Sequence, residues 1–493
     1  MELEYQFLLP LIIISVSSVA AVAFDAIWKN KNLNFSFSIF ALLATLIAAA
    51  YTLTASNEAI DAIKAMALSD LISKHQIHFG GYSAYFDILF CLAGLLTIVA
   101  AKPFIKREYE EYNEFYSLIL FSICGMMLIS HSSSLLVLFI GIELMSIPFY
   151  VLAGFFRKSI FSVEASLKYF FLGAFATGFL LYGMAMLYGA TGTLDIKEIG
   201  IIISQGEAIP IYLTLGIGLM LVGLSFKAAA FPFHQWAPDV YSGSPTVVSA
   251  FFATAGKAAA IVGFVIIAKE IIQFDVKSFQ IADTARTAQL IIAFISAATM
   301  LIGNLTALVQ KNVKRMLAYS SVAHAGYLLM GIVASNELGY TGIIFYISAY
   351  MFMQMGAFVI VSVFERNGNE KMSFDDYSGL YKSHPILSAL MSIFMLSLAG
   401  IPPFAGFFGK YYLFLAAIKA DFLWLTIVAV ISSIISMYYY IGLILQMYFK
   451  EQTHGRLKSK VGMAKYTLLI TAAAVIIFGI FPSLIVDLTY NFF

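Results

Sequence analysis

Apolar stretches of about 20 residues recur along the whole chain and are separated by short polar segments. A helix of that length crosses the hydrocarbon core of a bilayer, where the backbone must satisfy its own hydrogen bonds. The composition agrees, because 61% of the 493 residues are hydrophobic and only 12% are charged, whereas about 25% are charged in a soluble domain. We therefore predict an all-α polytopic membrane protein that forms a single membrane domain, 1–493.

Hydropathy predicts fourteen transmembrane helices. The expected spans are 7–28, 35–56, 82–102, 115–130, 134–156, 163–188, 208–235, 244–269, 287–309, 315–334, 339–364, 384–418, 421–449 and 465–489. The twelfth is longer than a bilayer requires and contains "AGIPPFAGFFGK", which indicates a helix broken midway.

The distribution of lysine and arginine predicts the orientation. Loops after odd-numbered spans, including the one that holds Lys314, carry 18 basic residues, and loops after even-numbered spans carry 7. We therefore expect the odd-numbered loops in the cytoplasm and both termini on the outer, periplasmic side.

Four lysines and one deep acid lie well inside predicted spans, namely Lys168, Lys227, Lys257, Lys410 and Glu143. Each charge at mid-membrane costs about 2.5–3.5 kcal/mol on insertion scales, and such residues commonly mark ion pathways. Burial favours the neutral form of a lysine and a nearby carboxylate favours the charged form, so a series of these groups can pass protons. We predict a proton relay.

Two simpler interpretations stay open. A lysine near the end of a span can extend its head to the membrane interface, and Lys168 lies only about a turn and a half inside its span. Glu143 and one lysine could also form an ion pair that only holds helices together, although this explains one lysine and not three.

Prolines lie close to two of these lysines. In "GLSFKAAAFPFHQWAPD", Pro232 follows Lys227 by five residues, and a Pro-Pro pair at 402–403 precedes Lys410. Because proline cannot donate to the carbonyl four residues earlier, the pair frees the carbonyls of residues 398 and 399. At membrane depth such carbonyls must be buried in protein or face water. We expect local hydration beside both lysines.

The order of the spans predicts two inverted repeats. Spans four to eight and nine to thirteen each contain five helices, and the broken helix is the fourth in both sets; since five is odd, the second set would be inverted. The expected organisation is three N-terminal helices (1–110), a first repeat (111–270, broken near 208–235), a second repeat (280–449, broken near 384–418) and a C-terminal helix (450–493). Lys227 and Lys410 would be pseudo-symmetric partners.

Two histidines are further candidates. His324, in "AYSSVAHAGYLLM", lies in the middle of span ten and could titrate near neutral pH, or could be a satisfied core histidine. His234, near the cytoplasmic end of span seven, is a weaker candidate for admitting protons. No nucleotide-binding motif, CxxC motif or haem-ligating histidine pair occurs in the sequence. We expect no cofactor or metal in this chain, and the net charge of +1 does not suggest nucleic acid.

Four segments strongly resemble the antiporter-like membrane subunits of respiratory complex I. They are "GIELMSIPFYVLAGF", "FKAAAFPFHQWAPDVYSGSPTVVSAFFATAGKAAA", "NVKRMLAYSSVAHAGYLLMG" and "LSLAGIPPFAGFFGKYYLF". The resemblance covers roughly residues 80–450 and is greatest for the N-type subunits of bacterial NADH-quinone oxidoreductase. Lys410 supports that choice, because the M-type subunits usually have glutamate there.

The resemblance implies a role for each candidate. Glu143 would pair with Lys227 where protons enter, and Lys168 would modulate that pair. Lys257 and His324 would form the central part of the relay. Lys410 would be the terminal proton donor toward the outside.

The function implied is proton translocation in the membrane arm of NADH-quinone oxidoreductase, in the bacterial inner membrane. FMN, iron–sulfur clusters and quinone would be bound by partner subunits, and neighbours of the M, K, J and L types are expected in the bilayer. One alternative is a subunit of a multisubunit sodium or potassium/proton antiporter or of a membrane-bound hydrogenase. Another is a passive scaffold whose buried charges serve only assembly.

Overall fold

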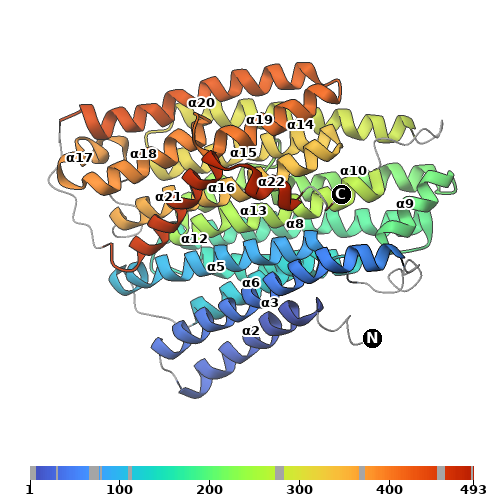
Figure 1. The fold of residues 1–493 in the computed structure, drawn as a ribbon, viewed down its shortest axis with the longest axis horizontal. Coiled ribbons are helices and arrows are strands. Elements are labelled where there is room, and N and C mark those ends of the chain that lie inside the picture. The colour runs from blue at the N-terminus through green and yellow to red at the C-terminus, as the bar shows by residue number, and fades with distance from the viewer. Residues whose placement is uncertain are drawn as a thin grey trace.

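The computed structural model describes residues 7–28, 31–65, 77, 80–108, 114–272, 282–365, 372–451, 461–489 and 492. Long helices run side by side through one bundle, with α2 along one edge and α20 along the opposite edge (Figure 1). The described residues contain no strand, only three isolated β-bridges. The predicted all-α fold is confirmed.

The first part of the chain forms the outer edge of the bundle and its first group of packed helices. Its helices are α2 (Leu9–Trp28), α3 (Lys31–Ala65), α5 (Gly81–Glu108), α6 (Glu114–Ser130), α7 (Leu135–Ala153), α8 (Ile160–Thr191), α9 (Ile196–Gln205), α10 (Pro210–Ala228), α11 (Trp236–Gly243), α12 (Thr246–Phe251), η1 (Phe252–Gly256), α13 (Lys257–Ile267) and η2 (Ala268–Ile272). The last four follow one another without a break and form one rod, in which η1 and η2 are π-helical turns.

The second part contains a comparable set. Its helices are α14 (Ala282–Leu308), α15 (Val313–Ala334), α16 (Glu337–Phe364), η3 (Phe374–Tyr377), α17 (Leu380–Ser383), α18 (Pro385–Ala399), α19 (Ala405–Lys419), α20 (Leu423–Phe449), α21 (Ala464–Ile480) and α22 (Ser483–Thr489). Every predicted span falls on one or more of the helices in the two parts. By length and hydropathy, eleven of the described helices can cross a membrane, or twelve when α21 and α22 count as one bent span.

Both predicted helix breaks are present. Helix α10 ends at Ala228, and Ala229 adopts a left-handed conformation with φ 58°. Helix α18 ends at Ala399, and Gly400 has φ 82°. In both places proline follows within four residues and prevents the helix from continuing.

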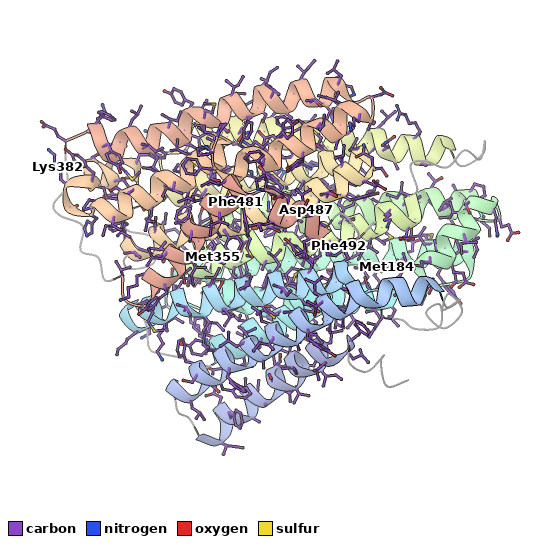
Figure 2. All side chains as sticks on the ribbon, viewed as in Figure 1. Met184, Met355, Lys382, Phe481, Asp487 and Phe492 are labelled. Carbon is purple, nitrogen blue, oxygen red and sulfur yellow. The ribbon has the colours of Figure 1, made fainter. Side chains whose placement is uncertain are left out.

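One further break was not expected. The predicted span 465–489 is divided into α21 and α22, which meet at an angle of 78°. Pro482 lies at the junction and cannot donate the backbone hydrogen bond that a continuous helix requires. Figure 2 shows Phe481 and Asp487 on this C-terminal segment, with Phe492 beyond them. The ring centroid of Phe492 lies 6.0 Å from that of Tyr85 on α5.

The most buried helices are α15, α16 and the rod α12 to α13. Nearly all of their residues are buried, whereas α2, α8 and α20 have faces of exposed large hydrophobic side chains. Such faces suit contact with lipid or with other membrane subunits. The centre of the bundle therefore excludes lipid, and it is where Lys257 and His324 lie.

Helix α21 packs directly against the connection between α18 and α19. A Cβ atom added to Gly479 would lie 2.0 Å from the carbonyl oxygen of Pro403 and 2.8 Å from the Cα atom of Phe404. Only glycine allows the two backbones to approach so closely. The C-terminal helix thus supports the broken segment that precedes Lys410.

We expect Gly479→Ala to destabilise the protein by about 1–3 kcal/mol, because the new methyl group overlaps backbone that cannot move aside cheaply. The matched control is Gly442→Ala on α20, where a Cβ atom would meet nothing within 4 Å. Thermal unfolding of the detergent-solubilised protein measures both. Equal melting temperatures for the two variants would contradict the close packing described above.

Candidate functional site

Lys227 and Glu143 face each other from α10 and α7. The Nζ atom of Lys227 lies 3.9 Å from Oε1 of Glu143 and donates a hydrogen bond of 2.7 Å to Oγ of Ser146. The same carboxylate oxygen accepts a hydrogen bond of 2.8 Å from Thr177 on α8. The side chain of Lys227 is 3% exposed and that of Glu143 is 26% exposed. The ion pair is therefore long and lies at the edge of the core, where a small shift could separate it.

The end of α10 favours a cation at this position. Lys227 lies in the last turn of the helix, where the carbonyl groups give a partial negative charge. One of these carbonyls, that of Phe226, accepts a hydrogen bond of 3.0 Å from the indole of Trp236. The break thus provides a favourable electrostatic environment for an ammonium group that is almost completely buried.

Lys168 does not contact the pair. Its Nζ atom lies 2.8 Å from Glu164 and 2.9 Å from Asp239, and its side chain is 42% exposed. Asp239 also forms an ion pair of 3.2 Å with Arg315, so the carboxylate on α11 connects α8 with α15. This placement agrees with a lysine that extends toward a polar region, as the simpler interpretation proposed.

Lys257 is the first residue of α13 and follows the π-helical turn η1. It is 3% exposed, and its Nζ atom donates a hydrogen bond to the backbone carbonyl of Ser321 on α15. Single π-helical turns within a helix often accompany functional sites. The lysine therefore joins the rod α12 to α13 with α15.

His324 has a hydroxyl partner on each side of its ring. Its Nδ1 atom lies 2.5 Å from the hydroxyl of Tyr346, and its Nε2 atom lies 3.1 Å from the hydroxyl of Tyr440. The ring of Tyr350 packs against it with centroids 4.9 Å apart. A hydroxyl can donate or accept, so this cage can serve either tautomer of the imidazole. His324 is thus both a satisfied core histidine and a group that can exchange protons with its neighbours.

Lys410 fills the break between α18 and α19. Its Nζ atom donates hydrogen bonds of 3.1 Å to the carbonyls of Leu398 and Ala399 and one of 2.9 Å to Oγ of Ser433. It also lies 5.0 Å from the centroid of the Tyr327 ring, within the range of a cation–π contact. The two carbonyls are those that the sequence predicted the prolines would free.

A row of uncharged polar groups lies between the surroundings of His324 and Lys410, where sequence neighbours on α20 stand between the hydrogen-bonded pairs. Tyr439, the neighbour of Tyr440, donates a hydrogen bond of 2.6 Å to Oδ1 of Asn304. Asn304 donates through Nδ2 to Oγ of Ser432 at 2.6 Å. The next residue, Ser433, is the hydroxyl partner of Lys410. None of these side chains stood out in the sequence, because serine, tyrosine and asparagine are neither charged nor rare.

His234 lies between α10 and α11 and is 9% exposed. Its ring centroid is 5.8 Å from that of Phe231. Among the described residues no hydrogen bond or ion pair joins it with Lys227, so the structure brings this weaker candidate near the break but not into the site.

Two buried pairs of ionisable side chains escaped the sequence analysis. Asp87 on α5 lies 2.8 Å from Nε2 of His131, and Lys314 lies 3.3 Å from Glu365. Asp87 falls inside the third predicted span and could have been found by the criterion that identified Glu143. Lys314 was assigned to a cytoplasmic loop, but its side chain is 0% exposed. In the described part of the chain, no group of three or more His, Cys, Asp or Glu side chains could hold a metal ion.

The fold and the buried charges define a class of polytopic membrane protein in which lysines lie at breaks in helices. The family described as "NADH:quinone oxidoreductase/Mrp antiporter, TM" matches residues 132–436. "NADH-quinone oxidoreductase subunit N 1" of Chloroherpeton thalassium is 39% identical over 488 residues, covering 99% of this chain and 98% of that protein. "NADH-quinone oxidoreductase subunit N" of Trichlorobacter lovleyi is 44% identical over 412 residues, 82% of each chain.

A solved structure agrees with these relatives. A chain of respiratory complex I from Thermus thermophilus superposes with a TM-score of 0.76 at 30% identity, covering 97% of this chain and 98% of that chain. The chain therefore belongs to the subunit N family of NADH-quinone oxidoreductases.

The cage around His324 gives a testable prediction. We expect Tyr346→Phe to destabilise the protein by about 1–3 kcal/mol, because a buried ring nitrogen loses its partner. The control is Tyr377→Phe, since the buried hydroxyl of Tyr377 has no hydrogen-bond partner among the described residues. Thermal unfolding in detergent compares the two variants, and a Tyr346→Phe protein as stable as the control would show that the short contact is not made.

Proposed function

We propose that this chain translocates protons as a membrane-arm subunit of NADH-quinone oxidoreductase, and that quinone reduction elsewhere in the complex drives it. One observation carries the proposal: four almost completely buried titratable groups and a carboxylate at the edge of the core each have a polar partner. They are the Glu143 and Lys227 pair, Lys257, His324 and Lys410. Membership of the subunit N family supports the same function.

The first step in the proposed mechanism separates Glu143 from Lys227. At 3.9 Å the two charges attract each other without a direct hydrogen bond, and Thr177 donates a hydrogen bond to the same carboxylate oxygen that faces Lys227. When the carboxylate moves away, the buried ammonium loses the charge that favours its protonated form. A proton then moves from Lys227 toward Lys257, and Lys227 is reprotonated from the cytoplasm.

The central step uses one face of α15. Lys257 is bound to the carbonyl of Ser321, and His324 lies one turn farther along the same helix, so both face the same region. The hydroxyls of Tyr346 and Tyr440 and the polar row that ends at Ser433 continue from there toward Lys410. Lys410 releases the proton to the outer side. Lys168 influences the entrance through Asp239 on α11.

We also infer two inverted five-helix repeats. Leu135 and Ile196 donate backbone hydrogen bonds to Leu194 and Ser133, and Val313 and Phe374 donate in the same way to Met372 and Lys311. The second set lies 178 positions after the first, as the bridges Ser134 to Asp195 and Asn312 to Ser373 also do. Such a constant offset supports a duplicated unit, with the boundaries 111–270 and 280–449 suggested by the sequence.

The repeat does not make Lys227 and Lys410 equivalent. Lys227 lies two residues before the left-handed Ala229, whereas Lys410 lies ten residues after the left-handed Gly400. The two lysines therefore occupy opposite sides of their helix breaks. When positions are related by the 178-residue offset, Lys227 corresponds to Ala405 and not to Lys410. Ser146, the hydroxyl partner of Lys227, corresponds to His324.

The remaining expectations belong to the same proposal. They are fourteen spans, termini on the outer side, a bacterial inner membrane, and neighbours of the M, K, J and L types. FMN, iron–sulfur clusters and quinone would be bound by partner subunits, and this chain would contribute no redox centre. The apolar faces of α2, α8 and α20 provide surface for lipid and neighbouring subunits.

Two alternative functions predict different measurements. The matching family description also names Mrp antiporters, so a cation/proton antiporter would show obligatory dependence of transport on sodium or potassium. A passive scaffold would need the buried charges for assembly alone. In that case, substitutions would lower the amount of complex and leave its turnover unchanged.

We expect Lys227→Ala to abolish most quinone-reductase turnover and proton pumping per assembled complex, whether or not sodium is present, because the relay loses its first buried proton carrier. Inverted membrane vesicles, with values normalised to assembled complex, provide both measurements. The control is Lys382→Ala, which removes an exposed lysine at one end of the bundle (Figure 2). Wild-type turnover per complex in Lys227→Ala would refute the relay, and strict sodium dependence would favour the antiporter.

A further inference from the structure

Lys314 and Glu365 form a buried ion pair that the proposed relay does not use. Lys314 lies in the first turn of α15, and Glu365 directly follows α16. Their side chains are 0% and 1% exposed, and the Nζ atom lies 3.3 Å from Oε1 of the carboxylate. The ammonium also donates a hydrogen bond of 2.6 Å to the carbonyl of Ser244. The second carboxylate oxygen accepts a hydrogen bond of 3.2 Å from the backbone N–H of Thr246.

Both charges bind the same short segment, the junction of α11 and α12. Ser244 ends α11 and Thr246 begins α12, so the ammonium meets a carbonyl at a helix end and the carboxylate meets an N–H at a helix start. These are backbone groups that helix ends leave without a partner inside the helix. The carbonyl carries a partial negative charge that attracts the ammonium, and the N–H carries a partial positive charge that attracts the carboxylate. The arrangement connects the junction with α15 and α16.

This junction determines where Lys257 lies. From Thr246 the chain continues through α12 and η1 to Lys257 without a break. Lys257 then donates to the carbonyl of Ser321 on α15, the helix that carries Lys314 at its start. The rod α12 to α13 is therefore attached to α15 at two points, at the junction and at Lys257.

The ion pair is unsuited to carrying protons itself. Lys314 and His324 are ten residues apart on α15, which corresponds to about 15 Å along a helix. Among the described residues, no hydrogen bond joins either member of the pair with Lys257 or His324. A buried ion pair often stabilises a protein no more than apolar packing would. The stability of the fold therefore does not explain why these two charges are placed against the junction of α11 and α12.

We propose that the Lys314 and Glu365 pair is a positioning clamp, which fixes the rod α12 to α13 in register with α15 so that Lys257 and His324 keep the spacing needed for proton transfer. The inference rests on the proposed function. It adds two positioning residues that neither contact the transferred proton nor belong to the relay.

Thr246→Pro tests the clamp without removing a charge. Proline is well tolerated at the first position of a helix, where it would remove only the N–H that Glu365 accepts. The preceding residue, Pro245, already has the extended conformation that a following proline requires (φ −53°, ψ 134°). The hydroxyl of Thr246 has no hydrogen-bond partner among the described residues, so its loss costs little.

We expect Thr246→Pro to assemble normally and to lose about tenfold in turnover and proton pumping per complex, less than the roughly 100-fold that a 1 Å misplacement of a reacting group can cost. The matched control is Ile160→Pro, at the first position of α8, where the preceding Ser159 is also extended (φ −90°, ψ 117°). Ile160 is 78% exposed, and we expect its variant to keep full turnover. Wild-type turnover in Thr246→Pro would overturn the proposal.

A double variant distinguishes positioning from general distortion. If the clamp acts through Lys257, Thr246→Pro combined with Lys257→Ala should be no slower than Lys257→Ala alone, because the effects of coupled residues do not add. Full additivity of the two losses would overturn the proposal. Full turnover in Lys257→Ala alone would instead show that the relay is wrong, so the two failures are distinguishable.

A second variant decides the case in which Thr246→Pro does not accumulate. Lys314→Met combined with Glu365→Gln removes both charges of the pair together and retains an amide oxygen for the N–H of Thr246. We expect the complex to assemble with reduced turnover, since the ammonium no longer holds Ser244. Wild-type turnover would show that the pair does not position Lys257. Failure of this neutral variant to assemble would show that the pair serves only to hold the helices together. Either result would reject the proposal.

Discussion

The structure depends on how an ammonium group is solvated where lipid and protein replace water. A charge there is tolerable only when polar atoms surround it. Each fully buried lysine meets oxygen: Lys227 binds Ser146, Lys257 binds the carbonyl of Ser321, Lys314 binds that of Ser244, and Lys410 binds the carbonyls at the end of α18. The helix ends and breaks supply several of these oxygens, because a continuous helix would use its carbonyls internally. The irregular backbone and the buried charges therefore require each other.

Hydroxyl partners make two of these sites compatible with proton transfer. A protonated lysine donates all its hydrogens, whereas a neutral one has two hydrogens and a lone pair. Ser433, which accepts from Lys410, can rotate its hydroxyl and donate to the neutral amine, while the two carbonyls keep their donors. Ser146 can do the same for Lys227. A carboxylate in place of either serine could not reverse its role without taking up a proton, so a hydroxyl lowers the cost of changing the lysine's charge.

The sequence predicted the features that follow from local rules. Charged residues in apolar stretches identified Glu143 and the lysines of the site, and the proline rule predicted the two carbonyls that Lys410 binds. The sequence could not decide between two interpretations of Lys168, a modulator of the pair or a lysine that extends to a polar region, because it does not show which face of a helix a residue occupies; Lys168 binds Glu164 and Asp239. Lys314 was missed because it lies one turn from a loop and its partner Glu365 is 51 residues away. The polar row through Asn304 was missed because such contacts join helices that are distant in the sequence.

A repeated register of backbone contacts relates the two halves of the chain, and Lys257 lies where they meet. An offset of 178 residues relates Ser134 to Asn312, and in the same register Glu143 corresponds to Ser321 and Ser146 to His324. Equivalent faces of α7 and α15 thus each receive the head of a buried lysine, Lys227 in one case and Lys257 in the other. Lys257 belongs to the first half but binds the second, so in the proposed relay neither half contains a complete path by itself. The proposed transfer through the centre therefore depends on the position of the rod α12 to α13 against α15.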